Sequence, residues 1–312
     1  MLIYTDNPDY LRHIFTSTVQ LKPADQKSIP EILSEINRQL YSDNRLYLGS
    51  TEKSSSFKHF YISKYVPFSQ YDMLLQFARS IPDFRENILC FAGSGINFHG
   101  FRQRKWISVI GNIHLSLLLH PGQPVERAEI AFLILAANAA AQTINQLKRV
   151  QTKAKIRWVN DITINRCKVG GVLAQTQIQG KTIDKVVLGI GLNVNRSPEI
   201  DNDQFVNTAT HINDHTDGLV YPLNEVLDIL ISRLEYNYSA ILEKKFPELL
   251  DYYINHSMVI GEKVEVYSDP REGRSTKVAE GIVTGITENL ELILSGQKEL
   301  VRKGRIKLIN NA

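Results

Sequence analysis

The chain has 312 residues, of which 43% are hydrophobic and 22% charged, and its formal net charge is +3. These values are ordinary for a globular protein, and the charge is too small to argue for a nucleic-acid partner by itself. The two cysteines, Cys90 and Cys167, lack metal-ligand spacing and indicate a reducing compartment without a disulfide framework. The first residues carry Asp6 and Asp9, unlike a secretory signal, and the most apolar stretch, residues 130–141, is too short to span a bilayer. We therefore expect a cytoplasmic protein with no membrane association.

The first 56 residues carry weak signals. Helical spacing runs over residues 29–41, where Pro30 suits the first turn, and residues 45–48 suit a short strand. Residues 50–56 are polar and rich in serine, which is typical of a linker. No pair of helices with the spacing of a DNA-reading module is visible, and no basic recognition helix. We treat residues 1–56 as an N-terminal extension of unknown role and expect no DNA partner.

The main domain is expected to start at residue 57. Residues 57–66 are rich in strand-forming side chains, and residues 87–91 form a short apolar run that also predicts a strand. Between them, Ser69 is placed to cap a helix over residues 70–79. On the sequence alone this serine can be a cap and nothing more.

A loop follows over residues 92–106, with the sequence AGSGINFHGFRQRKW. Its glycines permit backbone conformations that other residues resist. Its three cations are Arg102, Arg104 and Lys105. A loop of this kind can present backbone N–H groups and positive charge to an anion such as a triphosphate, although basic surface loops are common.

Two scaffold elements are predicted next. Residues 106–119 form an apolar run typical of a strand, and His114 within it is expected to be a packed core histidine rather than a catalytic base. Residues 124–147 are rich in alanine and predict a long helix, whose broad apolar face would be buried against a sheet.

The most informative stretch is residues 157–176, RWVNDITINRCKVGGVLAQT. Alternation over residues 156–164 predicts one strand, a two-residue turn follows, and residues 167–174 predict the second strand of a hairpin. In this register Thr163 faces Lys168, and Asp161 faces Gly170. Asp161 and Lys168 are then diagonal neighbours on one face, about 7–8 Å apart at the backbone. A three-residue turn would instead move Lys168 to the other face, and the pair could also be an ordinary surface ion pair.

The hairpin is followed by another strand over residues 185–195, which carries Gly189, Gly191 and Asn193 on one face. Glycines spaced by two allow a ligand or a neighbouring backbone to approach closely. Residues 201–221 are loop-like, and residues 224–245 have the spacing of an amphipathic helix. From residue 257 the pattern changes to short strands separated by turns, over residues 259–267, 279–287, 290–295 and 305–309, which suits a small barrel.

Three of these stretches together resemble biotin protein ligases. Residues 157–161 and 168–173 are similar to the KWxND…K(L/I)xG(I/V)L block of that family. The loop is similar to the family's GRGRxGRxW segment when Trp106 is aligned, so that Gly100 and Arg104 also match. Residues 189–193 match GxGxN, and the end of the chain is similar to the SH3-like cap of prokaryotic members. The resemblance covers residues 57–309.

The loop departs from the family pattern at several positions. His99 and Phe101 stand where the family has arginines, Gly95 falls near the place of a family glutamine, and Gln70 replaces the threonine that follows Ser69. Arg102 can supply one of the missing cations. These departures put in question how tightly an adenylate is retained and which acid is bound.

The resemblance implies an α+β fold, with a mixed, mainly antiparallel sheet flanked by helices and a small C-terminal SH3-like β-barrel. The implied domains are residues 57–256 for catalysis and 257–312 for the barrel. Lys168 and Asp161 are the implied catalytic residues. The implied biotin and ATP contacts are Ser69, Gln70, Gly95, His99, Gly100, Phe101, Arg102, Arg104, Trp106, Asn160, Gly170, Gly171, Gly189, Gly191 and Asn193. No metal ligands are assigned to the chain itself.

The implied reaction attaches biotin to a lysine of a biotin carboxyl carrier domain through biotinyl-5'-AMP, with ATP, biotin and Mg²⁺ as cofactors. Two alternatives stay open. One is a lipoate or octanoate ligase on the same fold, and the other is a biotin or adenylate sensor without enzymatic activity. A homodimer is also left open.

Overall fold

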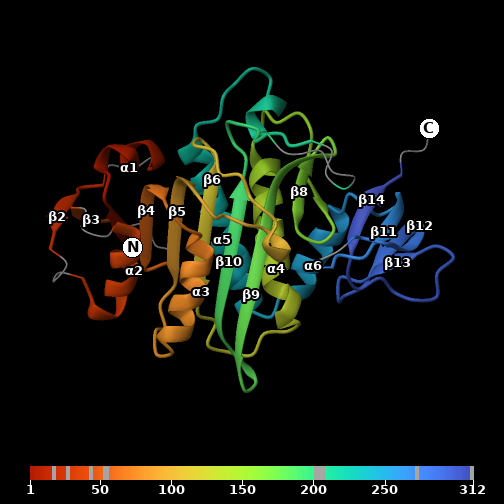
Figure 1. The fold of residues 1–312 in the computed structure, drawn as a ribbon, viewed down its shortest axis with the longest axis horizontal. Helices are drawn as coiled ribbons and strands as arrows, with labels where there is room; N and C mark the ends of the chain where they lie inside the picture. Colours follow the sequence, from red (N-terminus) through yellow and green to blue (C-terminus); the bar gives the residue numbers. More distant parts are fainter. Residues whose placement is uncertain are drawn as a thin grey trace.

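The computed structural model describes residues 1–312 except 16–18, 26–28, 42–44, 52–55, 200–204, 206–207, 271–273 and 310–312. The described chain forms two sheets. Ten strands make the larger one, in the order β2-β3-β1-β4-β5-β6-β10-β9-β8-β7, and four make the smaller one, in the order β13-β12-β11-β14. Figure 1 shows the long strands β9 and β10 at the centre, the N-terminal strands at one end and the smaller sheet at the other. The α+β class expected from the sequence is confirmed.

The strands of the large sheet run mostly antiparallel, and only β1–β4 and β4–β5 are parallel pairs. Their bounds are β1 Leu2–Thr5, β2 Lys22–Ala24, β3 Leu46–Ser50, β4 His59–Val66, β5 Ile88–Gly95, β6 Ile113–Leu119, β7 Lys155–Arg157, β8 Asp161–Ile164, β9 Cys167–Gln179 and β10 Thr182–Leu192. Those of the small sheet are β11 Lys263–Tyr267, β12 Lys277–Ile286, β13 Leu292–Leu294 and β14 Arg305–Leu308, close to the four strands expected.

Helices cover both faces of the large sheet. They are α1 Pro8–Ile14, α2 Ser34–Tyr41, α3 Gln70–Ser80, α4 Ala128–Gln146, α5 Leu223–Leu242 and α6 Phe246–Asn255, with short 3₁₀ turns at Glu31–Leu33, Phe101–Gln103 and Ile212–His215. Helices α2 and α3 enclose one apolar core against the sheet, and α1, α4, α5 and α6 enclose the other. Helix α4 is long and apolar enough to cross a membrane by composition, but 72% of its most apolar window is buried inside the fold. The expectation that it is scaffold is confirmed.

The N-terminal segment belongs to the same sheet as the residues after it. Strand β1 lies between β3 and β4, and its Ile3 and Tyr4 are almost completely buried. The helix and strand expected within residues 29–48 are confirmed by α2 and β3, whereas β1 was not expected because four residues are too few for a periodic pattern. Most of the expected serine-rich linker lies outside the described residues. The boundary before residue 57 stays a prediction.

Two other expectations are corrected. Residues 106–112 are not part of a strand, and β6 begins only at Ile113. Residues 156–164 form two strands rather than one, because the chain turns over residues 158–160 and β7 pairs back onto β8, with Arg157 opposite Asp161. Alternation of apolar and polar residues persists through such a tight turn, so the pattern does not reveal it.

The register of the β8–β9 hairpin is partly as expected. Thr163 lies opposite Lys168, which confirms the two-residue turn, but Asp161 lies opposite Gly171 rather than Gly170. The difference comes from a β-bulge, since Ile162 pairs with Gly170 and Val169 is left as the extra residue. Gly171 therefore takes the place beneath the acid and the amine that the sequence assigned to Gly170.

We predict that a chain starting at residue 57 will be markedly less stable than the full chain. Removing β1 uncovers the edge of β4 and exposes the apolar side chains that Ile3 and Tyr4 cover. A fall of at least about 10 °C in the thermal unfolding midpoint, or loss of solubility, is the expected result. An unchanged midpoint, measured by circular dichroism, would show that residues 57–312 fold on their own.

Candidate active site

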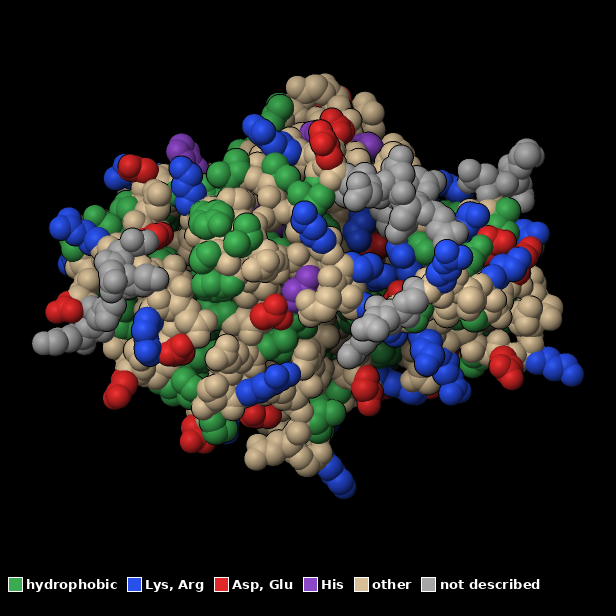
Figure 2. Space-filling view, viewed as in Figure 1, with side chains coloured by type: hydrophobic (Ala, Val, Ile, Leu, Met, Phe, Trp, Pro, Cys, Tyr) green, Lys and Arg blue, Asp and Glu red, His purple; other side chains and the backbone are tan. Residues whose placement is uncertain are grey.

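A cavity of about 1040 Å³ lies between the large sheet and the small one. Its walls come from the β8–β9 hairpin, β10, the loop before β6 and, from the C-terminal part, residues 268–270 and 302–306. Figure 2 shows Lys and Arg side chains gathered over this junction between the two sheets. The cavity is therefore shared by both parts of the protein and surrounded by positive charge.

The acid and the amine expected on the hairpin meet in this cavity. Lys168 Nζ lies 2.5 Å from Asp161 Oδ1, and both side chains are about three-quarters buried, with 26% and 22% exposed. A Cβ built on Gly171 would lie 3.5 Å from the Asp161 carboxylate and 3.6 Å from Lys168 Nζ. The absence of a side chain at Gly171 keeps this corner open, so a flat ligand can approach both groups.

Trp106 forms the wall beside Lys168. Its ring centroid lies 5.9 Å from Lys168 Nζ, within the range of a cation–π contact. The ring packs on Gly191, where any Cβ would collide with it, and its Nε1 donates to His114 Nδ1 at 3.2 Å. Burial lowers the pKa of His114 to about 4, so the imidazole is neutral at pH 7 and accepts this hydrogen bond. His114 is a packed histidine, as expected, and its hydrogen bond orients the Trp106 ring.

Gly189 and Gly170 also make room for protein groups. A Cβ on Gly189 would lie 3.0 Å from the ring of Tyr71, and a Cβ on Gly170 would lie 2.7 Å from the carbonyl oxygen of Gly191. The glycines of β10 thus seat two aromatic rings that face the cavity, rather than leaving its wall bare. Tyr71 was not singled out from the sequence, because an aromatic residue in the first turn of a helix carries no distinctive signal.

The start of α3 forms another wall. Ser69 caps this helix, since its hydroxyl accepts the amide N–H of Asp72 at 3.2 Å, as predicted. Gln70 lines the cavity but is only 2% exposed, and its Nε2 has no hydrogen-bond partner in the structure. The glutamine therefore fills space beside the helix start, with its amide donor unpaired.

The loop before β6 is fastened at two places. His99 Nε2 lies 2.8 Å from Asp72 Oδ2, which ties the loop to α3. On the other side, Arg102 Nε and Arg104 Nη1 lie 3.3 and 3.4 Å from Asp269 Oδ2, which ties it to the C-terminal part of the chain. The loop thus already has its cations turned into the shared cavity.

Other loop residues differ in exposure and packing. A Cβ on Gly100 would meet no atom within 3.6 Å, whereas a Cβ on Gly95 would collide with the carbonyl of Val66 and the ring of Phe98. Phe101 is 49% exposed, and the guanidinium carbon of Arg102 lies 5.4 Å from its ring centroid. Neighbouring protein atoms thus leave no room for a side chain at Gly95, and the Phe101 ring lies against the guanidinium group of Arg102.

The side-chain amides of Asn160 and Asn193 donate hydrogen bonds to backbone carbonyl groups. Asn160 Nδ2 donates to the carbonyl of Val172 at 2.8 Å, and Asn193 Nδ2 donates to the carbonyl of Thr210 at 3.0 Å. Asn193 is 1% exposed and its Oδ1 accepts from Asn112, so both halves of its amide are occupied. Asn193 also lines the cavity, and its assignment as a ligand contact stays a prediction.

Asp269 is another residue that sequence analysis missed. It lies 165 positions from Arg104, in a polar turn without a motif, so only the folded chain brings the two together. The C-terminal part is also anchored elsewhere, because Trp158 Nε1 donates to the carbonyl of Leu290 at 2.6 Å and Arg157 Nη2 to that of Ile306 at 2.5 Å. The ion pairs of Asp269 are therefore not needed to dock the small sheet.

Metal-ligand chemistry is sparse in the described residues, which contain no group of three His, Cys, Asp or Glu side chains able to hold an ion. Asp161 and Asp269 are the acidic side chains among the described lining residues. A magnesium ion would then depend on phosphate oxygens and water for its other ligands, as it usually does with nucleotides.

Comparison with known proteins identifies the central region. Residues 95–193 match the biotin/lipoate A/B protein ligase family. The bifunctional ligase/repressor BirA of Bacillus subtilis is 34% identical over 128 residues, which are 41% of this chain and 38% of that protein. The biotin–[acetyl-CoA-carboxylase] ligase of Paracoccus denitrificans is 25% identical over 199 residues, 63% of this chain and 79% of that protein. The chain thus spans about two-fifths of the BirA sequence it matches.

Solved structures agree on the fold. The biotin protein ligase of Aquifex aeolicus in complex with biotin and ATP superposes with a TM-score of 0.61 at 22% identity, covering 82% of this chain and 100% of that one. The biotin protein ligase of Leishmania major in complex with biotin gives a TM-score of 0.52 at 13% identity, covering 81% and 98%. The large sheet and its helices therefore have the architecture of biotin protein ligases.

We predict that Asp269→Asn loosens the loop. Two partly exposed ion pairs contribute roughly 0.2–1 kcal/mol each, so their loss should speed tryptic cleavage after Arg102, Arg104 or Lys105 by about 2- to 30-fold. Mass spectrometry of timed digests measures this rate. Glu288→Gln is the control, since it removes the ion pair with Arg127, which also joins α4 to the small sheet but lies outside the cavity. Equal cleavage rates in both variants would contradict the fastening role of Asp269.

Proposed function

The chain carries a domain of the biotin/lipoate A/B protein ligase family, and from that premise we propose that it is an ATP-dependent biotin–protein ligase. The observation that supports this most directly is the Lys168–Asp161 pair over Gly171, at 2.5 Å, in a cavity that also holds Arg102 and Arg104. An amine, a carboxylate and two guanidinium groups around one open space suit the condensation of a carboxylic acid with a nucleotide and then with an amine.

In the first step, an oxygen of the biotin carboxylate attacks the α-phosphorus of ATP. A P–O bond to that oxygen forms, the bond to the β-phosphate bridge breaks, and diphosphate leaves with the electron pair. Two anions must approach each other, so Lys168, Arg102 and Arg104 would lower the repulsion and stabilise the charge that develops. Magnesium, bound with the phosphates, would supply further positive charge.

Biotin entry also changes the state of Asp161. The carboxylate of the ligand would draw Lys168 Nζ away from Asp161 Oδ1, to which it is paired in the structure. Asp161 is then available to another hydrogen-bond donor. The exchange couples substrate binding to preparation of the second step.

In the second step, the ε-amine of an acceptor lysine attacks the carbonyl carbon of biotinyl-5'-AMP. An unperturbed lysine has a pKa of about 10.4, so the amine must lose a proton before it attacks. Asp161 would take that proton. The C–N bond then forms, the bond between the carbonyl carbon and the phosphate oxygen breaks, AMP leaves with the electron pair, and the new amide nitrogen releases a second proton. The cavity walls from both sheets would keep water from the mixed anhydride.

The protein substrate we propose is the biotin carboxyl carrier domain of a carboxylase, in the cytoplasm. The lipoate and octanoate alternative rests on the loop, where His99 and Phe101 replace arginines of the family pattern. The sensor alternative requires binding without turnover.

We predict that the purified protein with ATP, Mg²⁺ and biotin forms biotinyl-5'-AMP, detected by mass spectrometry, and that Lys168→Ala lowers the rate at least about 100-fold. Loss of one preorganised charge at the reacting group costs roughly this much. Lys245→Ala is the matched control, because this exposed lysine pairs with Glu243 away from the cavity.

Each other outcome of this experiment contradicts the proposal in its own way. A lipoyl- or octanoyl-adenylate in place of the biotinyl product would identify the sister activity. Biotin binding without any adenylate would identify a sensor. An unchanged rate in Lys168→Ala would remove the assignment of this lysine.

A further inference from the structure

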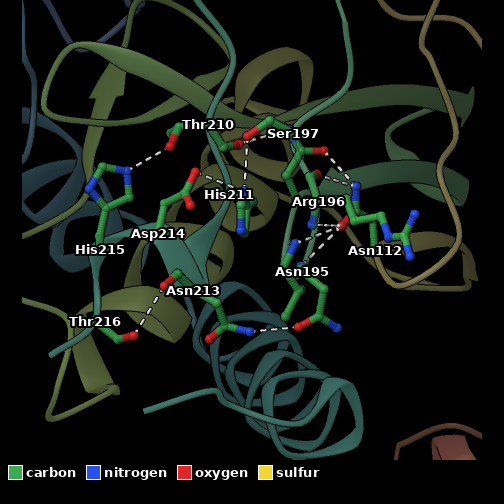
Figure 3. A network of polar contacts seen from close by, with 12 residues as sticks. Asn112, Asn195, Arg196, Ser197, Thr210, His211, Asn213, Asp214, His215 and Thr216 are labelled. Atoms are coloured by element: carbon green, nitrogen blue, oxygen red, sulfur yellow. Dashed lines mark hydrogen bonds and ion pairs between the residues drawn. The ribbon is translucent and has the colours of Figure 1, made fainter. Parts of the chain in front are cut away.

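A network of buried amides connects the segment after the loop to the end of β10. Asn112 is completely buried, and its Oδ1 accepts the amide N–H groups of Val194, Asn195 and Arg196 at 3.0, 3.2 and 3.2 Å. Its Nδ2 donates to Asn193 Oδ1 at 3.2 Å and to the carbonyl of Arg196 at 2.8 Å. Figure 3 shows Asn112 beside Asn195 and Arg196, with these bonds converging on its amide. Asn112 has no capacity left for a ligand.

The network continues from Asn193 to Lys168. Asn193 Nδ2 donates to the carbonyl of Thr210, and the amide of Thr210 donates to the carbonyl of Lys168 at 2.8 Å. The amide of Lys168 in turn donates to the carbonyl of Thr208 at 3.0 Å. Residues 208–210 thus hold both backbone groups of Lys168.

These contacts take the place of a neighbouring strand beside Lys168. Strand β10 ends at Leu192, opposite Gly170, so it does not reach as far as Lys168 along β9. Residues 208–210 lie parallel to β9 at this point, and the Thr210 hydroxyl lies 2.7 Å from His215 Nε2. Figure 3 shows the side chains of Thr210 and His215 turned toward each other. Without this segment, one edge of the backbone at Lys168 would have no partner in the sheet.

We propose that Asn112, Asn193 and Thr210 are positioning residues for Lys168, acting through its backbone. The effect on catalysis rests on the proposed function, but the effect on the Lys168 backbone does not. The ammonium must reach Asp161 at 2.5 Å while it stays 5.9 Å from the centre of the Trp106 ring. If the backbone of Lys168 loses its hydrogen bonds on one edge, the position of its ammonium group becomes less well defined. Small displacements of a reacting group lower the reaction rate strongly.

Asn112→Asp removes the two hydrogen bonds that Asn112 Nδ2 donates and keeps those that Oδ1 accepts. The three amide N–H groups around Oδ1 remain good partners for a carboxylate, which favours the charged form at this buried position. The new oxygen, however, faces Asn193 Oδ1 and the carbonyl of Arg196 with no proton to donate. The fold around residues 194–196 is therefore retained while the connection to Asn193 is lost.

Thr210→Val is the second variant, and it introduces no charge. It removes the hydrogen bond between the Thr210 hydroxyl and His215 Nε2 and keeps the shape of the side chain. Two matched controls are available in α4. Asn138→Asp removes a buried amide that donates to the carbonyl of Leu249, and Thr143→Val removes a buried hydroxyl that donates to the carbonyl of Ala139.

The first measurement is the rate of hydrogen exchange at the Lys168 amide, monitored by NMR on the full chain without added ligand. We expect exchange at least about tenfold faster in Asn112→Asp and Thr210→Val than in their controls, with exchange of the Leu188 amide in the middle of β10 unchanged. Equal rates at Lys168 in variants and controls would overturn the proposal. This readout does not depend on any enzymatic activity.

The second measurement is the biotin dissociation constant, alone and in the Lys168→Ala background. We expect each variant to weaken binding about tenfold in the natural chain and to have no further effect once Lys168 is truncated, because both changes act through one group. Equal losses in both backgrounds would show a general structural role and overturn the proposal. Failure of the natural chain to bind biotin would instead overturn the proposed function.

Discussion

The proposed site depends on one contact, the 2.5 Å ion pair between Lys168 and Asp161. A partly exposed ion pair contributes little to the free energy of folding, so the importance of this pair lies in the positions it gives to the amine and the carboxylate. Each charge of the pair balances the other, and in the proposed reaction a ligand carboxylate binds Lys168 and releases Asp161. The β-bulge at Val169 and the bare backbone of Gly171 set this geometry, since they bring both side chains to one side and leave space between them.

The two sheets are coupled through this cavity. Trp158 and Arg157, in the turn and strand that precede Asp161, donate hydrogen bonds to carbonyl groups of the small sheet. Asp269, beside β11, meets Arg102 and Arg104. The small sheet thus holds the turn before the acid and also fastens the cationic loop. A C-terminal module that the sequence describes only as a small barrel is, in the folded chain, one wall of the site.

The sequence was informative where a signal is local. Alternating side chains predicted the β8–β9 hairpin and the pairing of Thr163 with Lys168, and the apolar run around His114 predicted its burial. The bulge was not predictable, because an extra residue leaves the pattern of side-chain types unchanged. Strand β1 is too short for periodicity, and Asp269 and Asn112 act through partners far away in the chain. Resemblance located the glycines of β10, but only the structure shows that they seat Trp106 and Tyr71.

The division of labour between Lys168 and Asp161 can be measured by separating the two steps. Chemically prepared biotinyl-5'-AMP is supplied to the natural chain, Lys168→Ala and Asp161→Asn with a biotin carboxyl carrier domain, and the rate of transfer is followed by mass spectrometry. The account predicts that Asp161→Asn slows transfer at least about 100-fold, because it loses a general base, while Lys168→Ala transfers within about tenfold of the natural chain. Slow transfer by Lys168→Ala together with rapid transfer by Asp161→Asn would contradict it.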